Sequence, residues 1–325
     1  MSDLYPMLLL PEFKERVWGA RELAPIYPNY KMEGEPIGEV WLTGDECRVA
    51  NGRLTGQTLG VLAQRYGREL VGEATPQPER FPLLVKCLFP REKLSVQVHP
   101  ADEDARRAGL PCGKSECWYV VKAELDAQVG LGLKPGTTRA DFEAALRRGE
   151  RADQLLRWIY IKPGEMLYNP AGTVHAVGPG SVLVEIQQNS DTTYRLYDYG
   201  RARELHLEAG LAVLRERSGA GRVVSGSQKS MLVVSPWFRV EKLLVEGETI
   251  QYHRNTRPSS AWVVMALDGC GVVAAGGMEV SLATGDALVV PAAVSEFTVR
   301  PQWRLEYLAI GVPAPGAPHP PTSMD

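Results

Sequence analysis

Residues 164–175 read GEMLYNPAGTVH, a strand-length run that is followed by a tight turn and a histidine. Gly164 is followed after five residues by Pro170, and then by Gly172 and His175. Short apolar runs bounded by glycine and proline are typical of strands rather than helices. The stretch therefore predicts a strand and a turn that ends at His175.

The same spacing recurs near the C-terminus, where residues 285–296 read GDALVVPAAVSE. Pro291, Ala293 and Glu296 stand where the first stretch has its proline, second glycine and histidine. We infer an internal duplication in which only the first copy keeps its histidine. Function should therefore lie in the first copy.

The strands upstream of the two stretches also correspond. CWYVV at 117–121 matches AWVVM at 261–265, which places Ser260 where Glu116 stands in the first copy. The second copy thus has no carboxylate at this position, and we expect it to be metal-free.

Strand-length runs dominate the remaining sequence of both copies. In the first copy they are FPLLVKCLFP (81–90), KLSVQVHP (93–100), CWYVVKA (117–123), AQVGLGL (127–133), WIYIKPG (158–164) and SVLVEIQQ (181–188). Many short strands separated by Gly and Pro predict a mainly β fold built as a barrel or sandwich.

Helical spacing interrupts the strands at a few places only. It predicts helices over 58–72 and 207–216, and a helical insertion near 138–158 that begins with a capping box formed by Thr138 and Asp141. A length of 325 residues is about twice that of a usual single domain.

We predict three parts along the chain. A catalytic domain with its N-terminal segments covers 1–205, a helical linker covers 206–230, and a second, degenerate domain covers 231–325. The Pro-rich tail of the second domain is expected to be loose.

Charge and composition exclude several classes of function. The formal net charge of −3 gives no basic excess for nucleic-acid binding. No run reaches the roughly 18–20 apolar residues of a membrane span, and the N-terminus lacks the features of a signal peptide. Five cysteines without a CxxC pair suggest neither disulfides nor a thiolate metal site, which fits the reducing cytoplasm.

One strand of the first copy carries candidate metal ligands. In LSVQVHP, Ser95, Gln97 and His99 alternate along the strand and therefore share one face. Together with Glu116 and His175 they could supply two imidazoles, a carboxylate and an amide, a set that suits Zn²⁺.

Each of these residues also has an ordinary structural explanation. A strand histidine is more often a satisfied core or surface residue, Glu116 could be a solvated edge charge, and Gln97 could bond the backbone. The combination favours a metal site, because the four residues occur together and in order, with the glycine and proline spacing around His175.

These motifs resemble a known family. The Gly164–His175 turn is similar to the second cupin motif, and the whole chain resembles type I mannose-6-phosphate isomerases. The segments that carry the resemblance are FKERVWGA (13–20), GEVWLTG (38–44), LSVQVHP (94–100), GKSECWYVV (113–121), NPAGTVHAVG (169–178) and EIQQNSDTTYRLYDYGR (185–201).

The resemblance implies a fold and a metal site. It implies two cupin (jelly-roll) β-barrels with a few short helices, of which only the first carries metal. It also implies one Zn²⁺ per chain, held by Gln97, His99, Glu116 and His175.

The implied activity is the interconversion of mannose 6-phosphate and fructose 6-phosphate through a cis-enediol. By resemblance Arg195 assists catalysis, although it could instead form a structural pair with Asp191 or Asp198. Glu185 is the leading proton-transferring base, and Asp191 and Lys114 are alternatives.

A phosphorylated sugar is the expected partner, bound by polar and basic side chains beside the metal motifs. The candidates for substrate binding are Ser95, Lys86, Asp191 and Arg201, with Lys114 as a further cation near the phosphate. Lys86 and Arg201 could alternatively be solvated surface charges.

The second copy contains one imitation of the metal motif. Gln251-Tyr252-His253 resembles Gln97-Val98-His99, but His253 lies too close to Ser260 for the spacing of the first copy.

Two other functions use the same residues. A cupin oxygenase would hold Fe(II) with histidines and a carboxylate, and a non-catalytic protein could keep the fold and metal to bind sugar phosphate. The amide Gln97, the basic neighbours and the presence of Arg195, Glu185 and Lys114 favour the isomerase.

Overall fold

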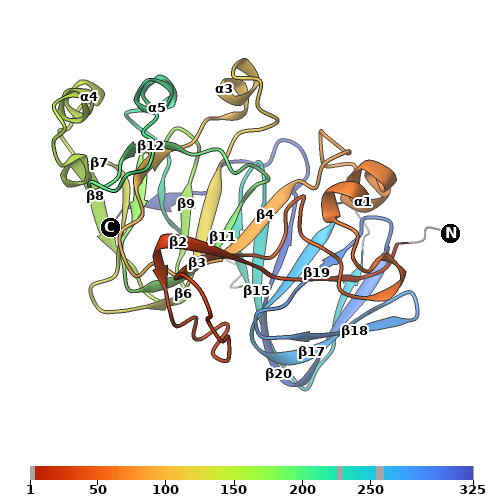
Figure 1. Cartoon of the computed structure of the whole chain (residues 1–325). Coiled ribbons are helices and arrows are strands. Elements are labelled where there is room, and N and C mark those ends of the chain that lie inside the picture. The colour runs from red at the N-terminus through yellow and green to blue at the C-terminus, as the bar shows by residue number, and fades with distance from the viewer. Residues whose placement is uncertain (1–3, 225–229, 254–259, 325) are drawn as a thin grey trace.

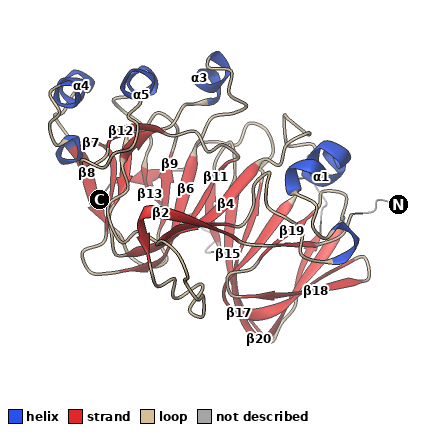
Figure 2. Ribbon diagram, viewed as in Figure 1, coloured by secondary structure: helices blue, strands red, loops and turns tan. Residues whose placement is uncertain are grey.

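Strands build almost all of the architecture, as Figure 2 shows. The computed structural model describes residues 4–224, 230–253 and 260–324, arranged as two β-barrels side by side (Figure 1). The predicted mainly β fold is confirmed. The short helices lie along one side of the molecule, above the strands in this view.

Two sheets form the first barrel. The eight-stranded sheet has the order β2 (Glu12–Ala20), β3 (Ile37–Trp41), β4 (Leu83–Leu88), β11 (Ser181–Gln188), β6 (Glu116–Ala123), β9 (Met166–Asn169), β13 (Gly221–Val223) and β21 (Thr322–Ser323). The five-stranded sheet has the order β12 (Tyr194–Tyr197), β5 (Val96–Val98), β10 (His175–Val177), β7 (Gln128–Leu133) and β8 (Leu156–Tyr160). Trp118 and Leu183 of the first sheet share a core with Val129 and Leu131 of the second, so the two sheets face each other.

The second barrel is a single sheet of eight strands. Its main path is β1 (Met7–Leu9), β19 (Ala287–Val290), β17 (Trp262–Ala275), β20 (Glu296–Gly311), β15 (Arg239–Glu246) and β14 (Met231–Val234). β16 (Ile250–His253) pairs with β20, and β18 (Met278–Ala283) pairs with β17.

Strand order supports the inferred duplication. The path β3-β4-β11-β6-β9 of the first barrel matches β14-β15-β20-β17-β19 of the second, with β9 and β19 arising from the two Gly-x5-Pro stretches.

The alignment of Ser260 with Glu116 is wrong by two residues. Asn169, which precedes Pro170, pairs with Glu116, whereas its counterpart Val290 pairs with Trp262. Trp262 therefore stands at the Glu116 position. A two-residue shift keeps the side chain on the same face, so the sequence pattern could not reveal it.

The alignment of Gln251-Tyr252-His253 with Gln97-Val98-His99 is also wrong by two residues. His175 pairs with Gln97, and its counterpart Glu296 pairs with His253. His253 thus corresponds to Gln97 and not to His99. Residues 254–259, where a counterpart of His99 would fall, lie outside the described residues.

Near both ends of the chain, a strand pairs with a different part of the chain from the one to which it was predicted to belong. β1, from the predicted catalytic domain, joins β19 of the second barrel. The strand β21, from the Pro-rich tail, pairs with β13 of the predicted linker, which in turn pairs with β9.

The expectation of a loose tail is wrong. Tyr168 of the first barrel and His319 of the tail are joined by a hydrogen bond between Oη and Nδ1 at 2.8 Å, and the ring of Trp237 packs edge-on against His319. These contacts hold the tail against both barrels.

The helices agree with the predictions in place but not in length. The helix expected over 58–72 is α1 (Leu59–Tyr66) and α2 (Arg68–Val71), separated by Gly67 at φ +50°. The third predicted helix is α5 (Leu207–Val213). A short helix, α3 (Asp102–Arg107), and a 3-10 turn, η1 (Gly52–Leu54), were not predicted.

The insertion near 138–158 is helical in two pieces, the second of which ends at Leu155. Thr138 caps α4 (Arg139–Arg147) through the predicted capping box with Asp141, and the 3-10 turn η2 (Ala152–Leu155) follows. Residues 156–158 instead begin β8, because they pair with β7. Among the described helices, none is long and apolar enough to span a membrane.

Candidate metal centre and catalytic pocket

One row of side chains crosses the five-stranded sheet. Gln97 of β5 is the register partner of both His175 on β10 and Arg195 on β12. Directly paired residues point their side chains to the same face of a sheet. His175 is buried in the barrel interior, so Gln97 and Arg195 share its inward face.

A second row crosses the facing sheet. Glu116 of β6 is the register partner of Asn169 on β9 and Gln187 on β11, and all three side chains are buried. Asn169 donates a 2.7 Å hydrogen bond from Nδ2 to Glu116 Oε1, which fixes the carboxylate.

His99, Glu116 and His175 converge between the two rows. The Nε2 atoms of His99 and His175 lie 3.5 and 3.3 Å from the Glu116 carboxylate oxygens, and one ligand atom from each residue lies within 4.8 Å of the others. Neighbouring ligand atoms around a tetrahedral ion with bonds of about 2.1 Å are about 3.4 Å apart. The three side chains therefore fit a single metal ion.

Hydrogen bonds set the protonation of both imidazoles. Nδ1 of His99 lies 2.9 Å from the carbonyl oxygen of Thr192, and Nδ1 of His175 lies 3.0 Å from that of Thr173. A carbonyl only accepts, so each Nδ1 carries a proton and each Nε2 keeps a lone pair. Within the described part of the chain, His175 Nε2 and Glu116 Oε2 are buried without a hydrogen bond, as metal-binding atoms would be.

Burial also prepares the charge states of this cluster. It lowers the pKa of His175 to about 4 and holds the pKa of His99 well below its usual value, so both rings are neutral near pH 7. Burial raises the pKa of Glu116 to about 7, against the opposing effect of the Lys114 charge. A bound cation would favour the carboxylate form.

Lys114 lies at the same centre. Its Nζ is 3.1 Å from His99 Nε2 and 3.3 Å from Glu116 Oε2, and the side chain is buried. The single lone pair of His99 Nε2 cannot accept from Lys114 and bind a metal at once, so metal binding requires the ammonium to move away. The structure thus brings Lys114 to the predicted ligands.

Glu185 belongs to a buried charge cluster beside the centre. Its Oε1 lies 3.2 Å from Lys86 Nζ, and its Oε2 accepts from Trp118 Nε1 at 2.9 Å. Burial acts to raise the pKa of Glu185, but the charges of Lys86 and Lys114 outweigh burial and leave that pKa lowered. Glu185 is therefore ionised near neutral pH.

Lys86 is not a surface charge. It is only 3% exposed, and its Nζ lies 3.7 Å from Glu39 and 3.9 Å from Asp191, besides Glu185. Burial alone would lower the pKa of Lys86, but the carboxylates Glu39 and Glu185 raise it, so the ammonium stays charged.

Arg195 does not pair with Asp198. Asp198 binds Arg201 and Arg203, at 2.8 and 2.6 Å. Arg195 donates from Nη1 to the Glu204 carbonyl at 2.8 Å, and its buried Nε has no hydrogen bond within the described residues. Burial lowers the pKa of Arg195, with Arg203 contributing.

The remaining substrate-binding candidates lie at different depths. Ser95 is buried two residues before Gln97, on the same strand face. Asp191 is mostly exposed. Arg201 is committed to Asp198 and to the Lys93 carbonyl, which its Nη2 reaches at 2.8 Å.

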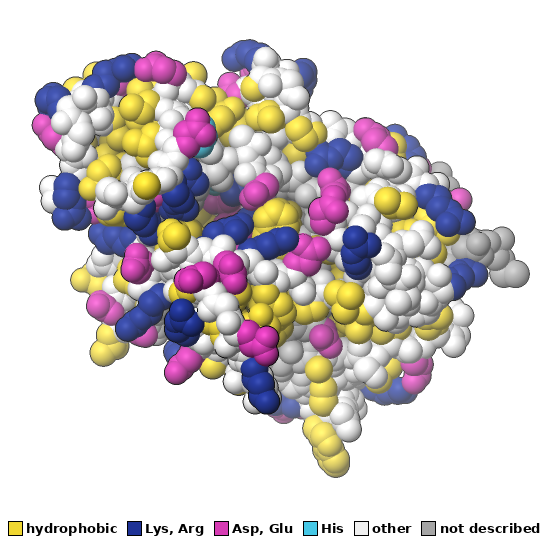
Figure 3. All heavy atoms as spheres, in the orientation of Figure 1, with side chains coloured by type: hydrophobic (Ala, Val, Ile, Leu, Met, Phe, Trp, Pro, Cys, Tyr) yellow, Lys and Arg dark blue, Asp and Glu magenta, His cyan; other side chains and the backbone are white. Residues whose placement is uncertain are grey.

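A recess lies on the surface of the first barrel. Figure 3 shows Lys and Arg side chains around a recess between β12 and β2, which are edge strands of the two sheets of the first barrel. The recess lies on the side of the barrel that carries Arg195 on β12. A phosphate dianion would be attracted to this basic rim.

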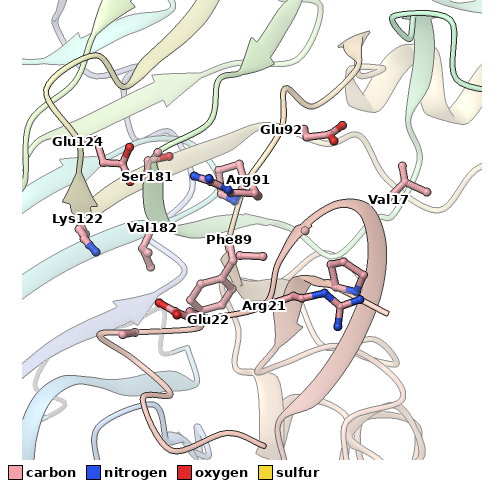
Figure 4. Close-up of a pocket in the computed structure, with 16 residues that line it drawn as sticks. Val17, Arg21, Glu22, Phe89, Arg91, Glu92, Lys122, Glu124, Ser181 and Val182 are labelled. Atoms are coloured by element: carbon pink, nitrogen blue, oxygen red, sulfur yellow. The ribbon is translucent and has the colours of Figure 1, made fainter. Parts of the chain in front are cut away.

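A separate cavity of about 620 Å³ lies at the other end of the first barrel (Figure 4). Lys122 and Ser181 line it, whereas Glu116 and Gln187 are at the opposite ends of the same two strands, about 20 Å away. The lining combines three basic and three acidic side chains, namely Arg21, Arg91, Lys122, Glu22, Glu92 and Glu124. This balance gives no preference for an anion, and none of the predicted site residues lines the cavity.

Comparison with known proteins agrees with this geometry. A profile of the catalytic domain of type I phosphomannose isomerase matches residues 7–125. The mannose-6-phosphate isomerase ManA of Bacillus subtilis strain 168 is 35% identical over 309 residues, which are 90% of this chain and 95% of that protein. This chain belongs to the type I phosphomannose isomerase family. The predicted family, and with it the prediction of an enzyme, is confirmed.

Further relatives of this phosphomannose isomerase family member extend the comparison. The mannose-6-phosphate isomerase of Streptococcus mutans is 33% identical, covering 88% of this chain and 92% of that protein. The crystal structure of the Bacillus subtilis mannose 6-phosphate isomerase superposes with a TM-score of 0.82 at 30% identity, over 94% of this chain and 99% of that one. The predicted cupin fold is thereby confirmed.

One solved neighbour shares the fold at lower identity. A zinc-bound mannose 6-phosphate isomerase superposes with a TM-score of 0.72 at 16% identity, over 93% of this chain and 98% of that one.

Sequence reasoning missed several polar residues around the candidate site of this phosphomannose isomerase family member. Asn169 bonds Glu116, Trp118 bonds Glu185, and Glu39 pairs with Lys86. Asn169 stands directly before Pro170 in the motif, and Trp118 lies two residues after Glu116. Both could have been found from the alternation of side chains along a strand.

Proposed function

We propose that this protein interconverts mannose 6-phosphate and fructose 6-phosphate through a cis-enediol, with one Zn²⁺ per chain. The observation that carries the proposal is the buried cluster of His99, Glu116 and His175 in a member of the type I family, whose relatives are named for this activity. The expected partner is a phosphorylated sugar, and a cytoplasmic location is part of the proposal.

Zinc is the metal that the donor set favours. Two neutral imidazoles and a carboxylate are usual zinc ligands, and Gln97 would add its amide oxygen from the strand beside His175. The zinc-bound neighbour with the same fold supports this choice. When bound, the ion would polarise the sugar oxygens at C1 and C2 and stabilise negative charge on them.

The reaction moves two protons. A base takes the C2 proton of the aldose while the C1 oxygen gains a proton, which gives the enediol; the C2 oxygen then loses its proton as C1 gains one. We assign the carbon-bound proton to Glu185, because it is a buried carboxylate beside the centre that is ionised near neutral pH and can therefore accept a proton. Lys114, close to His99 and Glu116, would exchange protons with the sugar oxygens.

Arg195 would stabilise the enediolate. Its guanidinium stays charged and shares the face of Gln97, and its buried Nε is available to an oxygen anion.

The phosphate would lie toward the basic recess. We assign its contacts to Ser95 and to Arg201, which would have to share its guanidinium between the phosphate and Asp198, with the exposed Asp191 orienting sugar hydroxyls. Lys86 is already bound by carboxylates, so it would act mainly through its positive field.

The test is a coupled assay that offers mannose 6-phosphate and other phosphorylated aldoses to the protein as purified, after chelation, and after zinc restoration. We expect turnover that chelation abolishes and zinc restores. His175→Ala should lose both bound metal and activity, whereas the matched variant His253→Ala in the second barrel should keep both.

Other outcomes would identify the rival functions. Tight binding of mannose 6-phosphate without turnover would mean a non-catalytic sugar-binding protein. Oxygen consumption that requires Fe(II) would mean an oxygenase. Loss of metal in His253→Ala but not in His175→Ala would mean that the metal site lies in the second barrel and not in the first.

A further inference from the structure

Asp102 connects three separate segments behind the metal centre. Its Oδ1 accepts from the backbone nitrogen of Gly113 at 2.8 Å and from Nε2 of Gln188 at 2.8 Å. Its Oδ2 accepts from the indole Nε1 of Trp237 at 2.9 Å. Hydrogen bonds to an ionised carboxylate are stronger than those between neutral groups, so Asp102 acts as a fixed junction.

Two of these donors adjoin the segment that carries Lys114 and Glu116. Gly113 directly precedes this segment, and Gln188 accepts through Oε1 from the backbone nitrogen of Ser115 at 2.9 Å. Asp102 therefore holds the start of β6 from two sides.

The close approach of this segment to the His99 segment depends on Gly113. A Cβ at this position would lie 2.6 Å from the backbone nitrogen of Asp102. The backbone nitrogen of Lys114 donates to the Pro100 carbonyl at 3.0 Å. The two ligand-bearing segments are thus in direct backbone contact.

The third ligand segment joins the same assembly. The Gly172 nitrogen donates to the His99 carbonyl at 2.8 Å, and the Ala171 nitrogen donates to Ser115 Oγ at 3.1 Å. These residues belong to the turn that ends at His175. The segments that supply His99, Glu116 and His175 therefore form one bonded unit.

Trp237 is the only member of the Asp102 junction, among the described residues, that comes from the second barrel. It follows β14 in a short turn where its backbone nitrogen donates to Ser235 Oγ at 3.3 Å, and its ring packs against His319 of the tail. The turn and the tail fix the direction of the indole N–H.

We propose that the second barrel, whose described residues contain no cluster of metal-binding side chains, positions the metal ligands of the first through the hydrogen bond from Trp237 to Asp102. Trp237 and Asp102 are positioning residues, since neither reaches the ligand atoms. The inference rests on the proposed metal site. It gives the second barrel a role in metal affinity that its own lack of ligands would not suggest.

The test measures zinc affinity by competition with a chromophoric chelator, so it does not depend on turnover. Trp237→Phe keeps an aromatic ring and removes the N–H donor, and Trp303→Phe is the control because Trp303 is 83% exposed on β20. Replacing an outer partner of a metal ligand usually changes affinity 10–100-fold. Trp237 acts less directly, through Asp102 and then through Gly113 and Gln188, so we expect about a fivefold weaker Kd.

Asp102→Asn provides a second variant. An amide accepts through only one of its two outer atoms, so at least one of the three donors would face an NH₂ group. We expect a larger loss of affinity than for Trp237→Phe, and an unchanged affinity for Trp303→Phe. The ligand-field spectrum of the cobalt(II) form should change in the first two variants, since it reports the ligand arrangement.

The result that overturns the inference is a Trp237→Phe protein with the zinc affinity and cobalt spectrum of the wild type, even if its metal-free form melts at a lower temperature. That combination would mean a purely structural contact. If the wild-type chain itself binds no zinc, the proposed function fails and takes this inference with it, so the two failures are distinguishable.

Discussion

Asn169 offers a direct test of how the carboxylate ligand is oriented. Its amide donates a 2.7 Å hydrogen bond to Glu116 Oε1 in a fully buried position. Asn169→Leu would remove this donor with little change in side-chain size. Glu116 would then lose the bond that sets the rotation of its carboxylate, at the oxygen that also faces His175, while its other oxygen still faces His99.

The expected size follows from the type of bond. A hydrogen bond to a charged group contributes about 1.5–3 kcal/mol, and about 1.4 kcal/mol corresponds to a tenfold change in an equilibrium constant. If the bond supports the metal-bound geometry, zinc affinity should fall about 10–100-fold, the range seen when outer partners of metal ligands are removed.

Equilibrium competition against a chelator of known affinity would measure this loss. The matched control is Asn51→Leu, which removes a half-buried amide that bonds the Leu8 nitrogen and the Pro6 carbonyl, away from the metal centre. Both variants should be less stable, but only Asn169→Leu should bind zinc more weakly. Equal zinc affinity in wild type and Asn169→Leu would refute the assigned role.

Three further predictions follow from the structure. Arg195→Ala should keep about one zinc per chain and lower kcat for mannose 6-phosphate by about 100-fold or more, as expected for loss of an oxyanion-stabilising donor; metal analysis and steady-state kinetics would check both, and unchanged turnover would contradict its role. Burial acts to raise the pKa of Glu39, but the charges of Lys86 and Arg16, together with hydrogen bonds from Trp41 and Arg16, outweigh burial and lower that pKa to about 2. The stabilisation from Glu39 is therefore present above about pH 4.5 and is lost as pH falls toward 2. Glu39→Gln should therefore lower the free energy of unfolding by up to about 3 kcal/mol at pH 7 and by much less near pH 2, in urea titrations at both pH values. Gly113→Ala should cost about 1–3 kcal/mol, because the new Cβ meets the Asp102 backbone; thermal melts indistinguishable from wild type would show that this backbone contact can relax.

Much of the site was predictable because the barrel strands keep strict alternation. Ser95, Gln97 and His99 fall on one face for this reason alone, and the turn spacing identifies His175 without any knowledge of its neighbours. The pairing of Gln97 with His175 could be seen only in the folded structure, because the sequence of a strand does not specify which strand pairs with it.

Two physical causes explain where the sequence misled or left the interpretation open. Shifting a strand by two residues preserves its buried face, so the alignments of Ser260 and His253 looked sound although the hydrogen-bond register excludes them. Lys86 was open to interpretation as a surface charge because lysines are seldom buried, and its burial depends on carboxylates from three separate segments. No local sequence pattern predicts that these carboxylates surround one lysine.

The first strand of the chain belongs to the second barrel and the last strand to the first, which affects how the chain can fold during synthesis. Figure 1 shows the N-terminus beside the second barrel and the C-terminus beside the first. During synthesis, Met7 emerges from the ribosome long before its partner Val289, and the strand at 322–323 of the first barrel emerges after all strands of the second. The first barrel therefore reaches its full set of strands only after every strand of the second barrel has been synthesised.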